Sequence, residues 1–474
     1  MSAKFARISL IVLMVTHFCL AAWFAMITPY RTGGILLNQR GPDAQPAFSK
    51  DIGAPDERQH ANYIGYLLKQ GKLPVFNPKS PTLYEDYQSH QPPLFYGLAA
   101  GVAKVTGQTD MESQSFGRTI RVFNCLIGTV GVAGVFFAAL WSTKREDVAV
   151  VAAAFAALLP LNVALSGAIS NDPLLIALVS WVIAFSARFL MEEAPSQRFF
   201  RAAAVAAVLV GLAHVTKSSA LTSLVLFTFS FAWAGGEFRK LPKEDLVPLR
   251  TAGAKIIGIM ALPFVIGLPI WLRNQSLYGD MLAQSAFKEA FVGSAQKSAI
   301  LGAIEAGPSA GSPEVQYWIN WIGYWTARSF IGVFGYMDIW FNASGKANSS
   351  SDPNILYKAI ILFNFLGLGG GVFWLRNNWK ENKRLGAITL GLIGLTLALF
   401  VMFNNTYFQA QARYLFPALS AFATLMAIGW VHIFKKWQIA LALVVVIFGG
   451  FTVYAGTQLP SEFAKRTQTA SPLP

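Results

Sequence analysis

The chain has 474 residues, of which 54% are hydrophobic and only 13% charged, and its mean hydropathy is +0.45. Soluble domains carry about a quarter charged residues, so this composition excludes an ordinary soluble protein and indicates a polytopic membrane protein. The formal net charge of +14 does not indicate a nucleic-acid partner. The basic residues fall in short runs between apolar segments, as they do at the cytoplasmic ends of membrane spans.

Apolar segments long enough to cross a bilayer recur along the whole chain. A transmembrane helix needs about 20 mostly apolar residues. The first such segment follows Lys4 and Arg7 and could pass for a signal peptide, but no small-residue cleavage site closes it, so we predict an uncleaved span. Cys19 and Cys125 lie inside apolar runs and indicate no disulfide framework. About eleven spans are predicted, over residues 5–28, 119–141, 147–166, 172–190, 200–215, 219–235, 252–272, 355–375, 385–403, 414–434 and 437–456.

The basic loops orient these spans. The positive-inside rule places the N-terminus in the cytoplasm, and strict alternation then puts each later basic loop on the same side. Two long segments, residues 29–117 and 273–353, are thereby predicted outside. Residues 92–105 are too short to cross and predict a helix that two prolines initiate. The Trp- and Tyr-rich residues 317–341 predict an interfacial or re-entrant piece.

The first outer segment contains the stretch APDERQH, which concentrates ionisable groups in an otherwise apolar chain. Asp56 and Glu57 follow Pro55, just before residues 61–68 become helical in pattern, so they could simply stabilise the helix dipole from its first turn. Asp56 also suits a general base, which needs a carboxylate within reach of a hydroxyl proton. A third interpretation is a divalent metal site made by Asp56, Glu57 and His60, since His60 lies one helical turn after Asp56.

Further charged residues are predicted near the same membrane surface. Asp172 lies in a very short turn, where Asn-Asp-Pro is also ordinary turn and N-cap chemistry. Lys217 lies between two apolar runs, where a lone lysine needs a partner, reaches the interface or binds an anion. Arg273 and Arg413 lie at outer ends of spans, against the positive-inside bias. Three cations beside carboxylates indicate a site for a lipid phosphate.

His90 and Gln91 precede two prolines at the end of the irregular part of the first outer segment. His90 could bind a ligand, donate a hydrogen bond or simply pack. The sequence holds no Walker loop, no dinucleotide fingerprint after a strand and no His-Glu-x-x-His. An enzyme without a nucleotide site that works outside the membrane needs a substrate already activated on a lipid.

The order of these motifs resembles that of the GT-C fold glycosyltransferases, which include the protein O-mannosyltransferases, the lipid A aminoarabinose transferases and a less characterised bacterial branch, to which the chain looks closest. The matching pieces extend to about residue 420 and are PDERQH, HQPPLFYGL, SNDPL, HVTKSSAL, RNQSLYGD and QARYLFPAL. There is one departure. The aminoarabinose transferases carry Glu-Lys before the double proline, where this chain has His90 and Gln91, so a phosphate-binding cation is missing there unless His90 is protonated.

The resemblance implies an enzyme that moves a sugar from a polyprenyl-phosphate carrier to an acceptor, usually with inversion. It makes Asp56 the expected general base, and we expect Glu57 or Asp172 to orient the acceptor or to position Asp56. The residues that this interpretation assigns are the catalytic Asp56, Glu57 and Asp172, the donor phosphate ligands Lys217, Arg273 and Arg413, and the further substrate or metal contacts His60, His90 and Gln91.

The implied partners are a polyprenyl-phosphate sugar, a lipid, glycan or protein acceptor, and membrane lipids, with no required cofactor and a divalent metal left open. We expect residues 1–350 to form the catalytic module, residues 354–458 the C-terminal spans and residues 459–474 a loose tail. The expected setting is a bacterial inner membrane, with the active site on its outer face. The alternative is a transporter or lipid-linked glycan flippase, which would place its ionisable groups near the membrane midplane.

Overall fold

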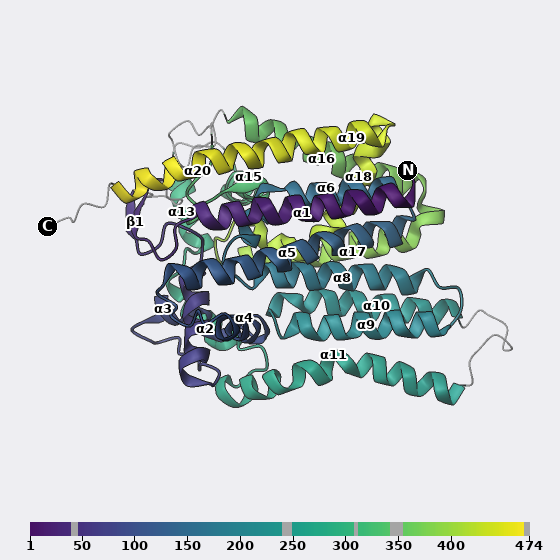
Figure 1. Ribbon diagram of the computed structural model, residues 1–474, viewed down its shortest axis with the longest axis horizontal. Helices are drawn as coiled ribbons and strands as arrows, with labels where there is room; N and C mark the ends of the chain where they lie inside the picture. Colours follow the sequence, from purple (N-terminus) through teal and green to yellow (C-terminus); the bar gives the residue numbers. More distant parts are fainter. Residues whose placement is uncertain (39–45, 239–248, 308–310, 342–353, 469–474) are drawn as a thin grey trace.

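The computed structural model describes residues 1–38, 46–238, 249–307, 311–341 and 354–468. Its long helices run side by side and form one bundle (Figure 1). A helix satisfies its backbone hydrogen bonds internally, which a chain in hydrocarbon requires. The long elements are α1 (Ala3–Ile27), α5 (Gln114–Thr143), α6 (Glu146–Leu158), α7 (Pro160–Ser166), α8 (Asp172–Leu190), α9 (Gln197–His214), α10 (Leu221–Phe238), α11 (Leu249–Tyr278), α16 (Ile355–Asn377), α17 (Trp379–Asn404), α18 (Leu419–Phe434), and α19 (Trp437–Val444), which passes through the π-helix η7 (Val445–Gly449) into α20 (Gly450–Gln468).

Each of the eleven predicted spans corresponds to a helix or helix pair of this bundle. Within the described residues, nine helices are long and apolar enough to cross a membrane, and the bent pair α6–α7 brings the number to ten. The remaining one, α9, carries Arg198 and Arg201 near its start, but it packs against α8 and α11 along the bundle (Figure 1). The prediction of an all-α polytopic membrane protein is confirmed.

The span predicted as one helix over residues 147–166 is broken in two. Pro160 cannot donate a backbone hydrogen bond and disfavours helical backbone in the residue before it, so α6 and α7 meet at a bend of 61°. The carbonyls at the end of α6 thereby lose their helical partners. His17 of α1 lies 2.8 Å from the Ala157 carbonyl through Nδ1 and 3.1 Å from the Ser166 hydroxyl through Nε2. This buried histidine therefore ties α1 to both halves of the broken span.

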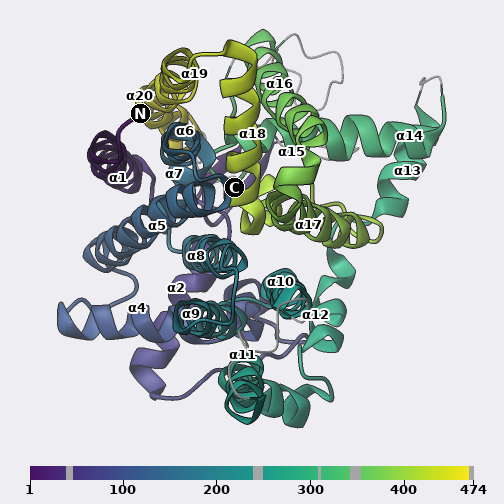
Figure 2. The same cartoon turned by 90° about the vertical axis from the view of Figure 1, so that its right-hand side faces the viewer.

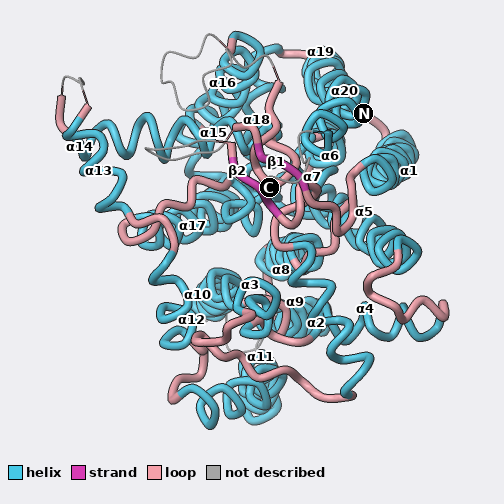
Figure 3. The backbone as a smooth tube through the Cα atoms, turned by 90° about the vertical axis from the view of Figure 1, so that its left-hand side faces the viewer, coloured by secondary structure: helices cyan, strands magenta, loops and turns pink. Residues whose placement is uncertain are grey.

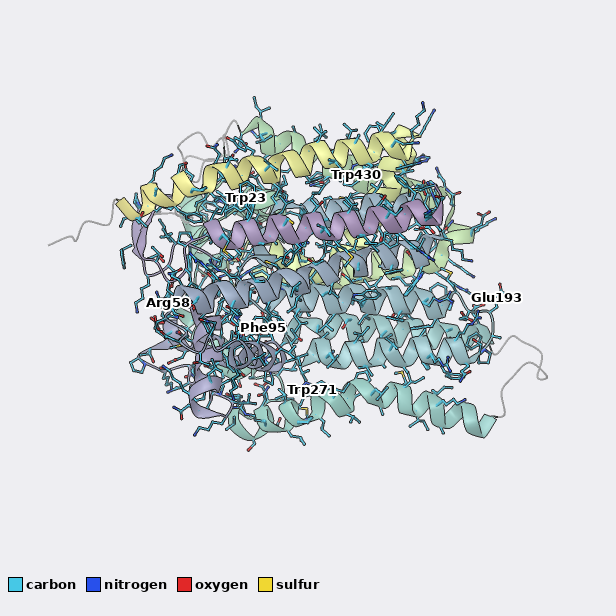
Figure 4. All side chains as sticks on the ribbon, in the orientation of Figure 1. Trp23, Arg58, Phe95, Glu193, Trp271 and Trp430 are labelled. Carbon is cyan, nitrogen blue, oxygen red and sulfur yellow. The ribbon has the colours of Figure 1, made fainter. Side chains whose placement is uncertain are left out.

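The shorter elements of the first long segment gather at one end of the bundle, on the left in Figure 1, and the N-terminus lies at the other end. Figure 3 looks onto this end, with the strands beside the C-terminus and α2, α3 and α4 below them. In Figure 4 Arg58 and Phe95 mark this end and Glu193 the opposite one. The helix predicted over residues 92–105 is confirmed as α4. The elements are β1 (Gly34–Leu36), β2 (Ala47–Ser49), α2 (Glu57–Gln70), α3 (Leu83–Asp86), η1 (Tyr87–His90) and α4 (Leu94–Val105).

The second long segment is also built of short helices. Figure 2 shows α13 and α14 projecting from one flank of the bundle. The stretch predicted as an interfacial piece begins as a π-helix and continues as α15, and part of the segment, residues 342–353, lies outside the described residues. The side of the membrane that either long segment faces stays a prediction from the basic loops. The elements are α12 (Gln284–Ala290), η4 (Phe291–Gly293), α13 (Lys297–Ala306), α14 (Pro313–Gln316), the π-helix η5 (Tyr317–Gly323) and α15 (Tyr324–Gly332).

The tail that we expected to be loose from residue 459 is instead helical as far as Gln468. Arg466 in its last turns is fully buried, with Nε 2.8 Å from Asp338 Oδ2. Glu462, one turn earlier, accepts from the same guanidinium at 3.0 Å. The polar composition of this stretch therefore reflects an ion-pair network that fastens α20 to the bundle, and the expectation of a loose tail is wrong for residues 459–468.

Candidate active site

Asp56 lies on the turn that leads into α2. Its backbone is left-handed, with φ of 60°, a conformation that costs a non-glycine residue about 1–2 kcal/mol and that recurs at functional sites. Gly53 permits the close approach of this turn to α1, because a Cβ there would collide with the Pro29 carbonyl. The Asp56 side chain makes no capping hydrogen bond to α2. Its Oδ2 lies 2.6 Å from Arg413 Nη2, so the carboxylate is directed toward a cation rather than toward the helix amides.

Two further predicted residues join Asp56 and Arg413 in what we call the charged cluster. Lys217, between α9 and η2 (Ser218–Ala220), places Nζ 2.5 Å from Asp172 Oδ1 at the start of α8. Arg413, in η6 (Ala412–Ala418), reaches toward both carboxylates, with Nη1 4.0 Å from Asp172 Oδ2. None of the four side chains is more than 24% exposed. The structure thus brings together four of the residues that the sequence singled out, from four separate parts of the chain.

The charged cluster balances two carboxylates against two cations. Burial opposes ionisation of the Asp56 carboxyl, but the positive charge around it, above all that of Arg413, outweighs burial and holds the pKa of Asp56 below its ordinary value. Asp56 is therefore an anion at neutral pH. Within the described part of the chain, Asp172 Oδ2 and Arg413 Nε are buried without a hydrogen-bond partner. Buried polar atoms normally have one, so the cluster has capacity left for a polar ligand.

Glu57 turns away from the charged cluster and is occupied by Arg121 of α5. Arg121 Nε and Nη2 lie 2.7 Å and 2.5 Å from the two Glu57 oxygens, and the Ile169 amide donates to Oε1 at 2.8 Å. Arg121 also donates to three backbone carbonyls at the end of α1 and just after it. Both Glu57 oxygens are thus engaged. The geometry therefore indicates that Glu57 holds the Asp56 turn in position against α1 and α5, rather than taking part in a reaction.

His60 lies beside the charged cluster but faces Tyr96. Its Nδ1 lies 2.8 Å from the Tyr96 hydroxyl and the two rings stack. Burial lowers the pKa of His60 to about 3, so its imidazole is neutral. The metal site considered for Asp56, Glu57 and His60 is not assembled. Over the ranges that the structure describes, no group of three or more His, Cys, Asp or Glu side chains is arranged to hold a metal ion.

His90 and Gln91 are linked to the charged cluster through Asn171. His90 Nδ1 lies 2.6 Å from the Tyr87 carbonyl, which assigns the ring proton to Nδ1, and Nε2 then accepts from Gln91 Nε2 at 2.9 Å. Gln91 Oε1 in turn lies 3.4 Å from Asn171 Nδ2, directly before Asp172. Burial lowers the pKa of His90 to about 4. His90 is therefore neutral and does not replace the missing cation.

Arg273 lies apart from the charged cluster. It is near the end of α11, where its Nη2 donates to the Pro74 carbonyl at 2.7 Å. This bond fastens α11 to the segment that follows α2. Of the three cations predicted to hold a phosphate, the structure therefore brings two together, Lys217 and Arg413.

The fold and part of the sequence match known glycosyltransferases. Residues 87–275 match the family model described as dolichyl-phosphate-mannose-protein mannosyltransferase. One match is a crystal structure of the Archaeoglobus fulgidus oligosaccharyltransferase in complex with zinc and sulfate. Its sequence is 13% identical, the match covers 98% of this chain and 53% of the archaeal chain, and the TM-score is 0.52. Another, tethered to an acceptor peptide, has a TM-score of 0.53 at the same identity. The chain therefore has the fold of this oligosaccharyltransferase, and residues 87–275 are similar to the mannosyltransferase family.

A weaker match is the Saccharomyces cerevisiae protein O-mannosyltransferase Pmt1–Pmt2 complex bound to the sugar donor. It is 18% identical, the match covers 58% of this chain and 35% of the yeast chain, and the TM-score is 0.43. No curated protein matches the sequence. The chain thus spans about half the length of the archaeal enzyme and about a third of the yeast one. The archaeal matches establish the fold of this chain and leave its activity open.

Sequence reasoning missed three residues that contact the predicted site residues: Arg121, Tyr96 and Asn171. Arg121 had a usable signal, since an arginine inside an apolar span needs a partner. Asn171 was visible as part of a turn motif, but its bond to Gln91 depends on tertiary contacts. Nothing in the sequence marks Tyr96 as the partner of His60.

Proposed function

We propose that this protein transfers a sugar from a polyprenyl-phosphate donor to a hydroxyl group of an acceptor, with inversion at the anomeric carbon. The observation that carries the proposal is the charged cluster of Asp56, Asp172, Lys217 and Arg413. A transporter would hold such groups near the midplane. Here Asp56, which pairs with Arg413, directly precedes α2, and α2 lies with α4 at one end of the bundle (Figure 1). We further propose that this end faces outward from a bacterial inner membrane.

Asp56 serves in this proposal as the general base. The acceptor oxygen attacks the anomeric carbon while the bond from that carbon to the carrier phosphate breaks. The hydroxyl proton passes to Asp56, and the electron pair of the broken bond leaves with the phosphate oxygen. Lys217 and Arg413 stabilise the charge that grows there. Because these two cations supply the positive charge at the leaving group, the proposal includes no metal cofactor.

Asp56 and Arg413 neutralise each other in the structure, so neither is free for its proposed part. A phosphate group offers a guanidinium several oxygens in a bidentate arrangement, and it competes well for arginine. When Arg413 turns to the donor phosphate, Asp56 loses the neighbour that most stabilises its charge and becomes a stronger base. Donor binding therefore precedes proton removal from the acceptor, and one arginine sets that order.

The proposal is tested with the purified chain in lipid vesicles and a polyprenyl-phosphate sugar that is labelled in the sugar. We expect the label to leave the lipid and appear on an acceptor alcohol with inverted configuration. Movement of the intact labelled lipid across the bilayer, with no loss of sugar, would identify a flippase and overturn the transferase.

Replacing Lys217 with glutamine is expected to weaken donor binding by roughly 10- to 100-fold, the worth of about one charge-assisted hydrogen bond. Glutamine keeps a donor for Asp172 and removes the charge. The measurement is the Kd of a polyprenyl phosphate, read by a fluorescence or calorimetric titration. Lys79→Gln is the matched control, because Lys79 is an exposed lysine that pairs with Glu289. An unchanged Kd in Lys217→Gln would remove Lys217 from the phosphate site.

The pH dependence of transfer is expected to report Asp56. The base acts in its ionised form, and its pKa lies below the ordinary value of 3.8, so transfer stays level from about pH 5 to 8 and falls only in stronger acid. His60 and His90, with pKa values lowered to about 3 and about 4, do not titrate in that range. Arg413→Gln removes the main stabilising charge, so the acid limb of kcat/KM moves to higher pH. An unmoved limb would contradict the Asp56–Arg413 coupling.

A further inference from the structure

A small cavity lies against Arg413 on the side of the C-terminal helix. Its volume is about 50 Å³. A water needs roughly 10–15 Å³ on the same measure, so the cavity holds on the order of three to five water-sized groups. Most of its wall is apolar and comes from α1, α7, the turn around Met337 and α20. Ser170, Gln411 and Arg413 form its polar side.

Two residues on the polar side of the cavity each have a buried polar atom without a hydrogen bond to any described residue. Arg413 Nε and Gln411 Oε1 each lack a hydrogen-bond partner among the residues that the structure describes. The first atom is a donor and the second an acceptor, and a hydroxyl group is the smallest organic group that can serve both. Ala54 and Pro55, which directly precede Asp56, line the same cavity. A hydroxyl held here would therefore lie close to the base.

We propose that this cavity is the acceptor subsite and that Leu459 and Phe463 of α20 limit the size of the group that carries the acceptor hydroxyl. The inference rests on the proposed function and deepens it, since it places the acceptor on the α20 side of Arg413 and the donor phosphate on the Lys217 side. The space takes a hydroxyl and about two to four carbon atoms. The acceptor class is therefore a short aliphatic alcohol end, and a sugar ring or an aromatic ring is excluded.

The wall that faces the acceptor is held rigidly. Leu459 is fully buried and Phe463 is 4% exposed, although both line the cavity. The buried Arg466 holds this part of α20 through Asp338, which also accepts from the Leu37 amide at 3.1 Å. Met337, beside Asp338, has a left-handed backbone with φ of 63°, a strained conformation that packing must maintain. A rigid wall of this kind discriminates by size.

The test uses simple alcohols as surrogate acceptors with the full chain and a labelled polyprenyl-phosphate sugar. We expect the wild-type chain to prefer ethanol to cyclohexanol, because one misplaced methylene in an apolar pocket changes kcat/KM by roughly 10- to 200-fold. Phe463→Ala should shift the ratio of the two kcat/KM values toward cyclohexanol by at least about tenfold. Val453→Ala is the matched control on the same helix, since Val453 is 48% exposed, and its ratio should equal the wild-type ratio.

A ratio that stays within twofold of wild type in folded Phe463→Ala and in the milder Phe463→Leu would overturn the assignment. If no alcohol is glycosylated even by the wild-type chain, the proposed function fails first, and a measurement without turnover decides the subsite. In a Cys19→Ser, Cys125→Ser background, Ala168→Cys places a thiol on the cavity wall and keeps Phe463. This thiol should react at least about tenfold faster with methyl methanethiosulfonate than with benzyl methanethiosulfonate. Equal reactivity with both reagents, or none with either, would show that the cavity admits no small solute and would overturn the subsite.

Discussion

Replacing Asp56 with asparagine is expected to slow sugar transfer by roughly 10²–10⁴-fold, the usual contribution of a positioned general base. Asparagine has nearly the same shape and tolerates left-handed backbone, so the turn before α2 should persist. It cannot take up a proton from the acceptor hydroxyl. The measurement is the first-order rate of sugar loss from donor-saturated protein, with the free energy of unfolding measured alongside.

The matched control for this change is Asp86→Asn, which removes an exposed carboxylate from the same long segment, residues 29–117. We expect its transfer rate to stay within about twofold of wild type, as surface substitutions usually have small effects. The donor should still bind to Asp56→Asn, and more tightly than to wild type, because Arg413 loses its nearer anionic partner and keeps only the more distant Asp172. Near-normal transfer by Asp56→Asn would remove Asp56 as the base, whatever the donor affinity.

The bundle was predictable because each membrane span is a nearly independent unit. A run of about 20 apolar residues has to form a helix in hydrocarbon, whatever its neighbours are. Among the described residues nine of the eleven spans meet that rule, the bent pair α6–α7 makes a tenth, and α9 does not meet it. The break at Pro160 was missed because the apolar run continues through it, and apolarity does not distinguish a straight helix from a bent one. The C-terminal stretch was misjudged for the opposite reason, since its polar residues turned out to be partners in the buried Arg466–Asp338 pair.

The residues of the charged cluster were predictable, but their pairings were not. A charge in an apolar chain is conspicuous because it is costly there, and this marked Asp172, Lys217 and Arg413 one by one. The partner is set by tertiary structure: Asp56 and Arg413 are 357 positions apart in the sequence. The spacing of Asp56 and His60 suggested that the two side chains share one face of a helix. In the structure His60 instead forms a hydrogen bond with the Tyr96 hydroxyl. Helical spacing shows which side chains share a face, not where each side chain points.

Replacing Glu57 with glutamine is expected to lower the free energy of unfolding by about 3–5 kcal/mol, the usual cost of leaving one partner of a buried ion pair unpaired. Arg121 is 2% exposed and Glu57 4%, so water cannot solvate the arginine once the carboxylate is gone. Chemical or thermal unfolding in detergent micelles measures the change. Glu112→Gln is the control, because its pair with Arg31 has the same 2.5 Å separation but a 58% exposed carboxylate. An exposed pair is worth only about 0–1 kcal/mol.

The double variant Glu57→Gln with Arg121→Gln should be less destabilised than the sum of the two single variants, because it leaves no unpaired buried charge. The same comparison separates the two adjacent acids by function. Transfer by Glu57→Gln should fall only as far as the folded fraction falls, whereas Asp56→Asn should lose transfer while fully folded. If Glu57→Gln unfolds like wild type yet transfers sugar a hundredfold more slowly, the two assignments exchange. The base would then be Glu57, the partner of Arg121, and Asp56 would serve to position Arg413.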